Sequence, residues 1–337
     1  MGKAKKNRTA RKIVLSLVCL IVLVLLLNLV IMPLTASVKR ASKGDFTGIG
    51  GYIKESTVLS AHRAGGGEAP EETLSAFQLC MENTKGYSVD ILEFDLHLTK
   101  DGVLVLLHDD TVDRTSNAIE LFGKKKNYAS DYTYAELREL NMGENFQDPN
   151  TKEYPYRGLR GSDIPENIRI LTLNGILDYV EKQVRPDGTM NYIIEIKNDD
   201  ELGRKAMDKL YETMVEYDIL DRVIVGTFKD KVTKYIDEKY SKEVTRSASI
   251  KEVLKFYYSY LYGVKLGETK YKVLQIPYKA AWFNFGTKEL IDYAHSYGIA
   301  CQYWTINKEK QIEELVKNGA DAIMTDYPEV AYPIVKG

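Results

Sequence analysis

From residue 57 onward, short apolar runs alternate with amphipathic segments. Short apolar runs rich in β-branched residues predict strands, and apolar residues spaced three and four apart predict helices. Strands are predicted at 57–62, 88–99, 103–109, 191–197, 222–228, 272–277, 299–306 and 320–325, with a weaker one at 242–249. Helices are predicted at 71–84, 172–184, 200–217, 229–240, 251–263, 287–298 and 309–319.

This alternation predicts an α/β protein with a parallel sheet. About eight strand–helix units favour a TIM (β/α)8 barrel. A doubly wound open sheet is the rival architecture, but the glycines after the first predicted strand lack the G-x-G-x-x-G spacing of a dinucleotide-binding turn. The segment from about 111 to 170 fits the alternation poorly and predicts an inserted subdomain or long loop.

The N-terminal segment has a different pattern. Residues 1–12 are basic, and residues 13–34 then form a run of 22 residues without a charge. That length spans a bilayer core, and the six preceding Lys and Arg residues predict a cytoplasmic N-terminus. No good small-residue cleavage site follows the run, which favours an uncleaved transmembrane anchor over a signal peptide. Residues 35–56 are interpreted as a juxtamembrane linker, which leaves residues 57–337 outside the cell membrane.

Charge and cysteine content exclude several classes of protein. The formal net charge of −2 gives no reason to expect nucleic acid as a partner. Cys19, Cys80 and Cys301 have no paired spacing, so they predict neither a disulfide framework nor a zinc site. We interpret all three as buried thiols. The sequence does not identify a protein partner.

Polar side chains stand at or near the ends of several predicted strands. In a parallel barrel, functional residues gather at the carboxyl ends of the strands. Glu93 and Asp95 are two apart and therefore face the same side of a strand, as do Glu195 and Lys197. The candidate site residues are His62, Arg63, Glu93, Asp95, His108, Glu195 and Lys197.

These residue types suggest a particular chemistry. Three converging carboxylates would be costly to bury without a cation, and oxygen ligands without thiols favour Ca²⁺ or Mg²⁺ over Zn²⁺. Arg63 and Lys197 add positive charge suited to a phosphate. Two histidines beside such a site, His62 and His108, can serve as general acid and general base.

Each pair alone has a simpler explanation. Glu93 and Asp95 could be a solvated strand face, and Glu195 and Lys197 a cross-strand ion pair. The functional interpretation depends on their joint order at successive strand ends. We interpret His97 as structural or as a support for the site, and His295, in a predicted helix, as a surface residue.

Three ordered motifs resemble the glycerophosphodiester phosphodiesterase family. They are SAHRAGGGEAPEET at 60–73, EFDLHLTKDGVLVLLHD at 93–109 and IIEIKN at 193–198. Later segments, WTIN and GADAIMTDYPE, resemble the family's closing strands. The resemblance covers about residues 57–335 and implies a TIM barrel with a small insertion after the second strand, matching the irregular stretch near 111–170.

The resemblance also implies roles. His62 and His108 match the acid/base histidines, and Arg63 and Lys197 match phosphate-binding cations. Glu71 matches an acidic residue that supports the metal site, and Trp304 matches an aromatic residue lining the pocket. The ligands of one divalent cation, Ca²⁺ or Mg²⁺, would be Glu93, Asp95 and Glu195.

The implied activity is metal-dependent hydrolysis of glycerophosphodiesters to an alcohol and glycerol 3-phosphate. Two departures, Ala64 for a usual glycine and Glu72 for a usual asparagine, leave the substrate preference open. The alternatives are an enzyme that acts on lysophospholipid or polyglycerolphosphate polymer, a phospholipase of the phosphatidylinositol or sphingomyelin type, and a non-catalytic barrel that binds such polymers.

Overall fold

The computed structural model describes residues 52–82, 87–280 and 283–337. Contacts between Cα atoms divide the chain into a barrel unit, residues 43–253 and 269–337, and a second unit whose described part is Leu254–Glu268. The predicted anchor at 13–34 and Cys19 lie outside the described residues. None of the helices in the described ranges combines the length and apolar character that crossing a bilayer needs.

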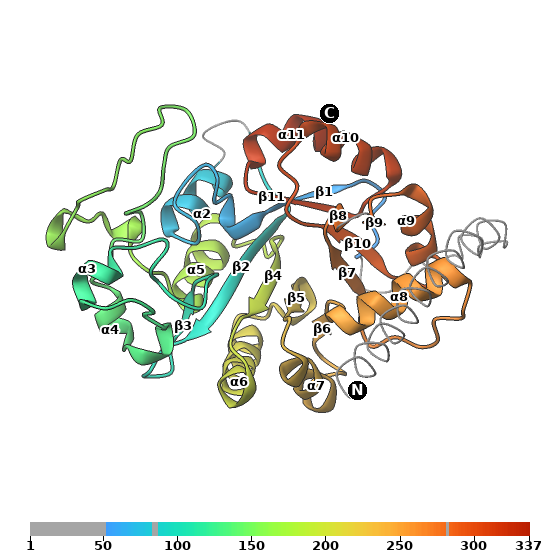
Figure 1. Cartoon of the computed structure of the whole chain (residues 1–337), viewed down its shortest axis with the longest axis horizontal. Coiled ribbons are helices and arrows are strands. Elements are labelled where there is room, and N and C mark those ends of the chain that lie inside the picture. The colour runs from blue at the N-terminus through green and yellow to red at the C-terminus, as the bar shows by residue number, and fades with distance from the viewer. Residues whose placement is uncertain (1–51, 83–86, 281–282) are drawn as a thin grey trace, which may run out of the picture. The chain divides into compact units, whose positions relative to one another are not determined.

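Eight strands of a nine-stranded sheet run parallel, in the order β6-β5-β4-β2-β1-β11-β10-β7 (Figure 1). A parallel bridge between Ser247 and Val273 joins the two ends of this order, so the strands form a nearly closed ring. This confirms the predicted TIM-like barrel. The strands are β1 Val58–Ala61, β2 Ile91–Leu98, β3 Leu104–Leu106, β4 Asn191–Ile196, β5 Val223–Gly226, β6 Thr245–Arg246, β7 Val273–Ile276, β8 Lys279–Ala280, β9 Phe283–Asn284, β10 Ala300–Tyr303 and β11 Ala322–Thr325.

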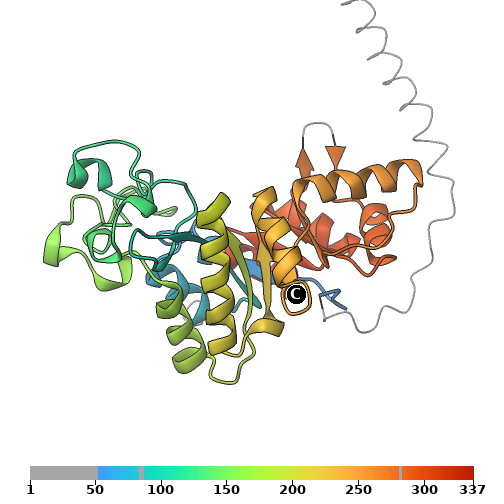
Figure 2. The ribbon, with the colours of Figure 1, turned by 90° about the horizontal axis from the view of Figure 1, so that it is seen from below.

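Helices follow most of the strands, and in Figures 1 and 2 helices α6 and α7 lie on the outside of the strands. In α6 the apolar face, which includes Ala206, Met207 and Leu210, is buried, while Lys205 on the opposite face is exposed. The α-helices are α2 Leu74–Met81, α3 Ala118–Phe122, α4 Tyr134–Leu137, α5 Leu173–Tyr179, α6 Asp200–Glu216, α7 Asp230–Lys239, α8 Ile250–Tyr262, α9 Lys288–His295, α10 Glu309–Asn318 and α11 Pro328–Lys336.

The barrel interior is packed with apolar side chains from six strands. Their burial removes apolar surface from water, which is the main stabilising contribution to the fold. The residues of this cluster are Ile91, Ile193, Ile224, Val273, Ala300, Ala322 and Met324. Because this core fills the barrel, the polar candidate residues can gather only near one end of it.

The third predicted strand, 103–109, does not belong to the ring. Its ordered part, β3, pairs antiparallel with β2. The connection from Leu98 to Leu104 is too short for a parallel crossover, which needs a dozen or more residues. Gly102, at φ +76°, makes the tight turn between the two strands.

Between β3 and α5 the chain forms an irregular segment with the short helices α3 and α4, seen in green to one side of the strands in Figure 2. The segment has its own apolar cluster, which includes Val112, Ala118, Leu137 and Met142. A capping box at Thr133 and Glu136 begins α4.

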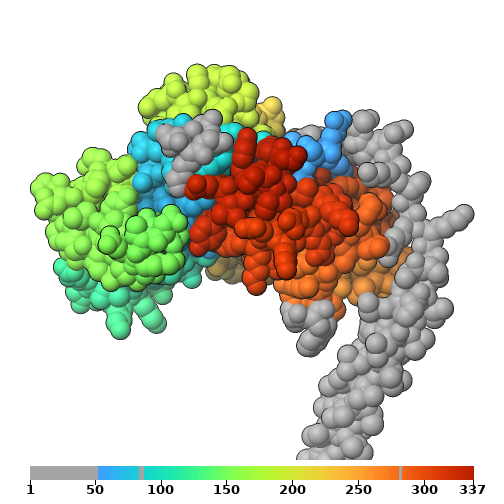
Figure 3. Space-filling view, turned by 90° about the horizontal axis from the view of Figure 1, so that it is seen from above, coloured from blue at the N-terminus to red at the C-terminus, as the bar shows by residue number. Residues whose placement is uncertain are grey.

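The two ends of the barrel unit meet in space. Strand β1 pairs with β11, and the Glu329 amide donates to Glu68 after β1. In Figure 3 the red C-terminal segment lies beside blue segments from the start of the barrel unit. This contact places residues after the last strand next to His62.

Two cysteine predictions are confirmed, and one histidine prediction is wrong. Cys80 and Cys301 are buried free thiols. His295 is buried rather than exposed, and its Nε2 lies 2.8 Å from Oδ2 of Asp321. The polar partner lies on another element, the chain just before β11, so the helical pattern around His295 did not reveal it.

Candidate active site

His62 and Arg63 begin a tight turn directly after β1. Arg63 and Ala64 both adopt left-handed backbone conformations, with φ of +50° and +60°, which cost energy for residues with a Cβ atom. At Gly67 an added Cβ would lie 2.6 Å from the ring of Tyr327, so this position requires glycine. The turn therefore brings backbone close to the residues that follow β11.

Glu93, Asp95 and Glu195 lie together because β2 pairs with β4. Asp95 is the direct cross-strand partner of Glu195. Glu93 and Asp95 are 5% and 1% exposed, so both carboxylates are almost removed from water. Burial and the charge of Asp95 raise the pKa of Glu93 and of Glu195 to about 7.

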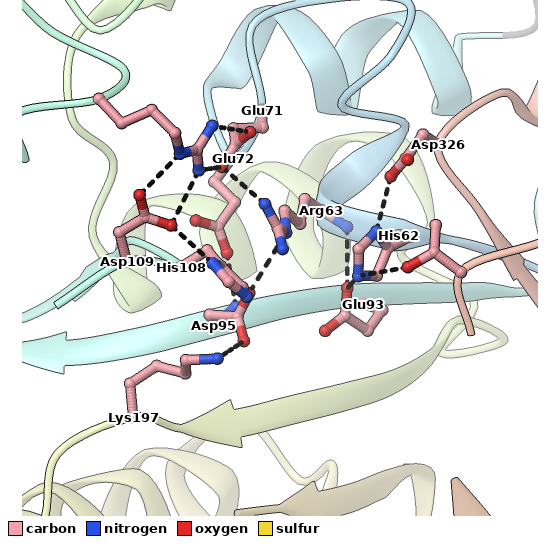
Figure 4. Close-up of polar contacts among 12 residues, drawn as sticks. His62, Arg63, Glu71, Glu72, Glu93, Asp95, His108, Asp109, Lys197 and Asp326 are labelled. Carbon is pink, nitrogen blue, oxygen red and sulfur yellow. Dashed lines mark hydrogen bonds and ion pairs between the residues drawn. The ribbon is translucent and has the colours of Figure 1, made fainter. Parts of the chain in front are cut away.

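Two cations lie among these carboxylates (Figure 4). Lys197 Nζ lies 3.1 Å from Glu195 Oε1 and 3.4 Å from Asp95 Oδ1. Arg63 Nε lies 3.9 Å from Asp95 Oδ2. Burial alone would lower the pKa of each cation, but the carboxylates outweigh it and raise both pKa values. Arg63 and Lys197 therefore stay charged.

His62 is held by a carboxylate from the last strand–helix loop. Its Nδ1 lies 2.6 Å from Asp326 Oδ1. Since a carboxylate only accepts, Nδ1 carries the proton. Nε2 is then the nitrogen that can exchange a proton, and it lies 3.5 Å from Thr305 Oγ1 and 4.0 Å from Glu93 Oε2. Burial alone would lower the pKa of His62, but Glu93 and Asp326 outweigh it, so this pKa is raised.

His108 has a matching arrangement. Its Nδ1 lies 2.8 Å from Asp109 Oδ1, which again leaves Nε2 as the free ring nitrogen (Figure 4). Burial lowers the pKa of His108, and the carboxylates of Asp95 and Asp109 only partly offset it. Each histidine therefore has a carboxylate that fixes its tautomer, a feature of general acid and base groups.

Five of the candidate residues line one cavity of about 80 Å³: His62, Glu93, His108, Glu195 and Lys197. Trp304 lines the same cavity. The ring centroids of Trp304 and Phe228 lie 6.0 Å apart at an interplanar angle of 67°. Phe228 also lines the cavity and is 45% exposed, so the wall is partly aromatic.

The carboxylates offer suitable ligands for a divalent cation. Both Asp95 oxygens are buried and accept no hydrogen bond, and the ion pairs with Lys197 at 3.4 Å and Arg63 at 3.9 Å are what offsets their charge. A divalent cation would neutralise this carboxylate further. Hard oxygen donors suit Ca²⁺ or Mg²⁺. As they stand in the described ranges, no three His, Cys, Asp or Glu side chains are gathered closely enough to form a metal cluster. Lys197, between Asp95 and Glu195, occupies part of this space.

Glu71, predicted to support the metal site, contacts guanidinium groups in the structure. Its Oε1 accepts from Arg63 Nη1 at 3.2 Å, and both its oxygens accept from Arg114. It is therefore engaged by guanidinium groups. His97 is buried, and Nδ2 of Asn198 lies 3.1 Å from its Nδ1. Burial lowers the pKa of His97 to about 4, which keeps it neutral.

Several residues of the site were missed from the sequence. Asp109 is the last residue of the predicted strand 103–109, and Asp326 directly follows β11. The rule that polar groups at strand ends carry function could therefore have found both. Phe228, two residues beyond β5, carries a weaker signal of the same kind. No sequence pattern pointed to Arg114 as a site residue, because it lies in the irregular segment and not at a strand end.

The parallel barrel, with paired histidines, two cations and buried carboxylates, defines the class of barrel enzymes that act on phosphodiesters. The model of the glycerophosphoryl diester phosphodiesterase family matches residues 62–330. The chain belongs to this family and is a phosphoric diester hydrolase.

Individual relatives support this family assignment. A glycerophosphodiester phosphodiesterase of Caldanaerobacter subterraneus is 29% identical over 283 residues, 83% of this chain and 98% of the relative. One from Bacillus subtilis is 26% identical over 344 residues, 99% of each chain. Among solved structures, an Oleispira antarctica phosphodiesterase in complex with the product sn-glycerol-3-phosphate has a TM-score of 0.61 at 20% identity, covering 84% of this chain and 98% of that one. That last likeness supports the fold.

Proposed function

We propose that the protein hydrolyses glycerophosphodiesters to an alcohol and glycerol 3-phosphate in the cavity between His62 and His108. The observation that carries this proposal is the pair of histidines, each with Nδ1 fixed by a carboxylate. A phosphodiester cleavage needs one proton removed from the attacking hydroxyl and one given to the leaving oxygen. Two preset histidines can perform both transfers.

Arg63 and Lys197 are the groups proposed to bind the phosphate. Both side chains are largely buried and charged, so their attraction for an anion is only weakly screened. When the phosphate enters, it competes with the carboxylates that these cations now contact. The side chains would then hold the non-bridging oxygens and stabilise the charge that develops on them.

The proposed reaction follows the route implied by the family. The substrate's free glycerol hydroxyl loses its proton to one histidine and forms a bond to phosphorus. The bond from phosphorus to the alcohol breaks, and the other histidine protonates the leaving oxygen. Water then opens the cyclic phosphate, with the two histidines exchanging roles.

A divalent cation is proposed to bind Glu93, Asp95 and Glu195. When bound, it would supply positive charge that favours the alkoxide and neutralises the phosphate. Glu93 already accepts from the Arg63 amide at 2.8 Å, which fixes one of its oxygens. The Asp95 oxygens, which are buried without a hydrogen bond and have only the longer ion pairs with Lys197 and Arg63, support this binding.

The cellular setting is also a proposal. The uncharged run at 13–34 with its basic flank is the basis for a single-pass anchor with the barrel outside the cell. Protease treatment of intact cells would test it. Loss of a C-terminal tag in intact cells is the expected result, and protection of the tag until the cells are lysed would contradict it.

Release of glycerol 3-phosphate, or of its acylated form where lysophospholipid is the substrate, tests the activity. The full-length protein in detergent micelles would be assayed with glycerophosphocholine, glycerophosphoethanolamine, lysophospholipid and polyglycerolphosphate, each with Ca²⁺, Mg²⁺ or EDTA. We expect metal-dependent release that is lost in His62→Ala and His108→Ala and kept in the exposed control Lys205→Ala. Near-normal turnover in either histidine variant would refute the assignment, and binding of polymer without turnover would support a non-catalytic barrel.

A further inference from the structure

Arg114, the fourth residue of the irregular segment that begins near Thr111, contacts two carboxylates at once. Its Nε and Nη2 donate to Asp109 at 2.6 and 3.0 Å. Its Nη1 and Nη2 donate to Glu71 at 2.9 and 2.6 Å. Such paired contacts fix a carboxylate in orientation as well as in place.

Each of these carboxylates also contacts a residue of the proposed active site. Asp109 accepts from His108 Nδ1 at 2.8 Å, and Glu71 accepts from Arg63 Nη1 at 3.2 Å. Figure 4 shows Asp109 beside His108 and Glu71 above Arg63, on two different elements. The Arg114 guanidinium therefore joins Asp109, the partner of His108, to Glu71, the partner of Arg63.

We propose that Arg114 is a positioning residue for catalysis: it clamps Asp109 and Glu71 together, and through them sets the orientation of both His108 and Arg63. The inference rests on the proposed function, because it assigns Arg114 to the reaction of that site. It also gives the segment after β3 a role in catalysis, because Arg114 lies in that segment.

The surroundings of Arg114 support this positioning role. Burial alone would raise the pKa of Asp109, but hydrogen bonds from Arg114 and His108 hold it well below its usual range, so Asp109 stays a charged acceptor. The backbone oxygen of Arg114 accepts from Asn145 Nδ2 at 2.9 Å. The clamp is therefore anchored within the segment between β3 and α5.

Lysine cannot replace arginine in this arrangement. Its ammonium is a single point donor, so it can keep the charge but cannot hold two carboxylates in fixed orientations. Arg114→Lys therefore keeps the positive charge but removes the paired hydrogen bonds to Asp109 and Glu71. Arg160→Lys is a matched control, because Arg160 also bridges two carboxylates, Glu120 and Glu144, in the same segment without contacting the site.

Steady-state kinetics on the full-length protein with glycerophosphocholine and the metal that supports activity test the clamp. We expect Arg114→Lys to lower kcat roughly tenfold to hundredfold, through His108, and to raise KM severalfold, through Arg63. Arg160→Lys should leave both constants near wild type. Adding Arg114→Lys to Asp109→Asn should lower kcat little further, because both changes disturb the same histidine.

A second measurement needs no turnover. The chain has only four histidines, so ¹⁵N spectra of the imidazoles can follow the His108 tautomer. We expect a protonated Nδ1 in wild type and a tautomer mixture in Arg114→Lys and Arg114→Gln. Unchanged kinetics and an unchanged tautomer in folded variants would overturn the proposal. An inactive wild type would instead refute the proposed function, and the spectra would still decide whether Arg114 orients His108.

Discussion

His62 and Asp326 are 264 positions apart in the chain, yet Nδ1 of the first lies 2.6 Å from Oδ1 of the second. Asp326 is itself held by Asn307, whose Nδ2 donates to Oδ2 at 2.7 Å. The pairing of β1 with β11 brings the two strand ends together. This contact decides which nitrogen of His62 faces the cavity.

Replacing Asp326 with asparagine should therefore impair catalysis more than binding. An amide can donate to Nδ1 and so stabilise the wrong tautomer, with the proton on Nε2. We expect kcat to fall by about 10²-fold or more with a smaller change in KM. Asp292→Asn, which removes only an exposed pair with Lys288, should be neutral. Equal kinetics for the two variants would contradict the role of Asp326.

Cation binding should depend on pH. The pKa of Glu93 and of Glu195 is raised to about 7, above the values in the unfolded chain. Without a cation, the folded protein therefore holds more protons on these two groups than the unfolded chain does near neutrality. Their contribution to the stability of the folded state falls as pH rises. A bound cation stabilises the ionised carboxylates and displaces their protons. We expect Ca²⁺ or Mg²⁺ to raise Tm more at pH 8 than at pH 6.

Calorimetry in two buffers of different ionisation enthalpy would count the protons released on cation binding. Glu195→Gln removes one titrating group and should release fewer. An affinity that is the same at pH 6 and pH 8, with no proton release, would show that these carboxylates are not the ligands.

Phe228 should contribute to substrate binding and not to the chemical step. It is 45% exposed, lines the cavity and packs edge-on against Trp304. We expect Phe228→Ala to raise KM about threefold to tenfold, the range of one aromatic contact, with kcat within about twofold. Val215→Ala, an exposed apolar change on α6, serves as the control. A fall in kcat at constant KM would argue against this role.

Gly203 in α6 should resist replacement by alanine although alanine is the better helix former. An added Cβ would lie 2.5 Å from the Asn198 carbonyl oxygen and 2.5 Å from Val232 Cγ2. Since backbone must move, we expect Gly203→Ala to lower the free energy of unfolding by about 1–3 kcal/mol. Lys205→Ala, on the exposed face, should change it by less than about 0.5 kcal/mol. Urea unfolding would measure both, and a stabilised Gly203→Ala would show that α6 can shift.

Local patterns in the sequence predicted much of the barrel. Strands such as β2 and β4 and helices such as α6 and α10 follow the predicted ranges closely, because their periodicity is a property of neighbouring residues. The spacing of Glu93 and Asp95 put both on one face of a strand for the same reason. Helix α11 was missed, since Pro328 and Pro333 disguise its pattern.

Short-range periodicity was enough to predict the alternation of elements, the barrel class and the polar residues at the strand ends. Three contacts became known only from the folded chain: Asp326 holds His62, Arg114 joins Asp109 to Glu71, and His295 is buried against Asp321. Each of these contacts joins separate elements. Their geometry depends on how strands pair and loops fold back, which no local spacing records.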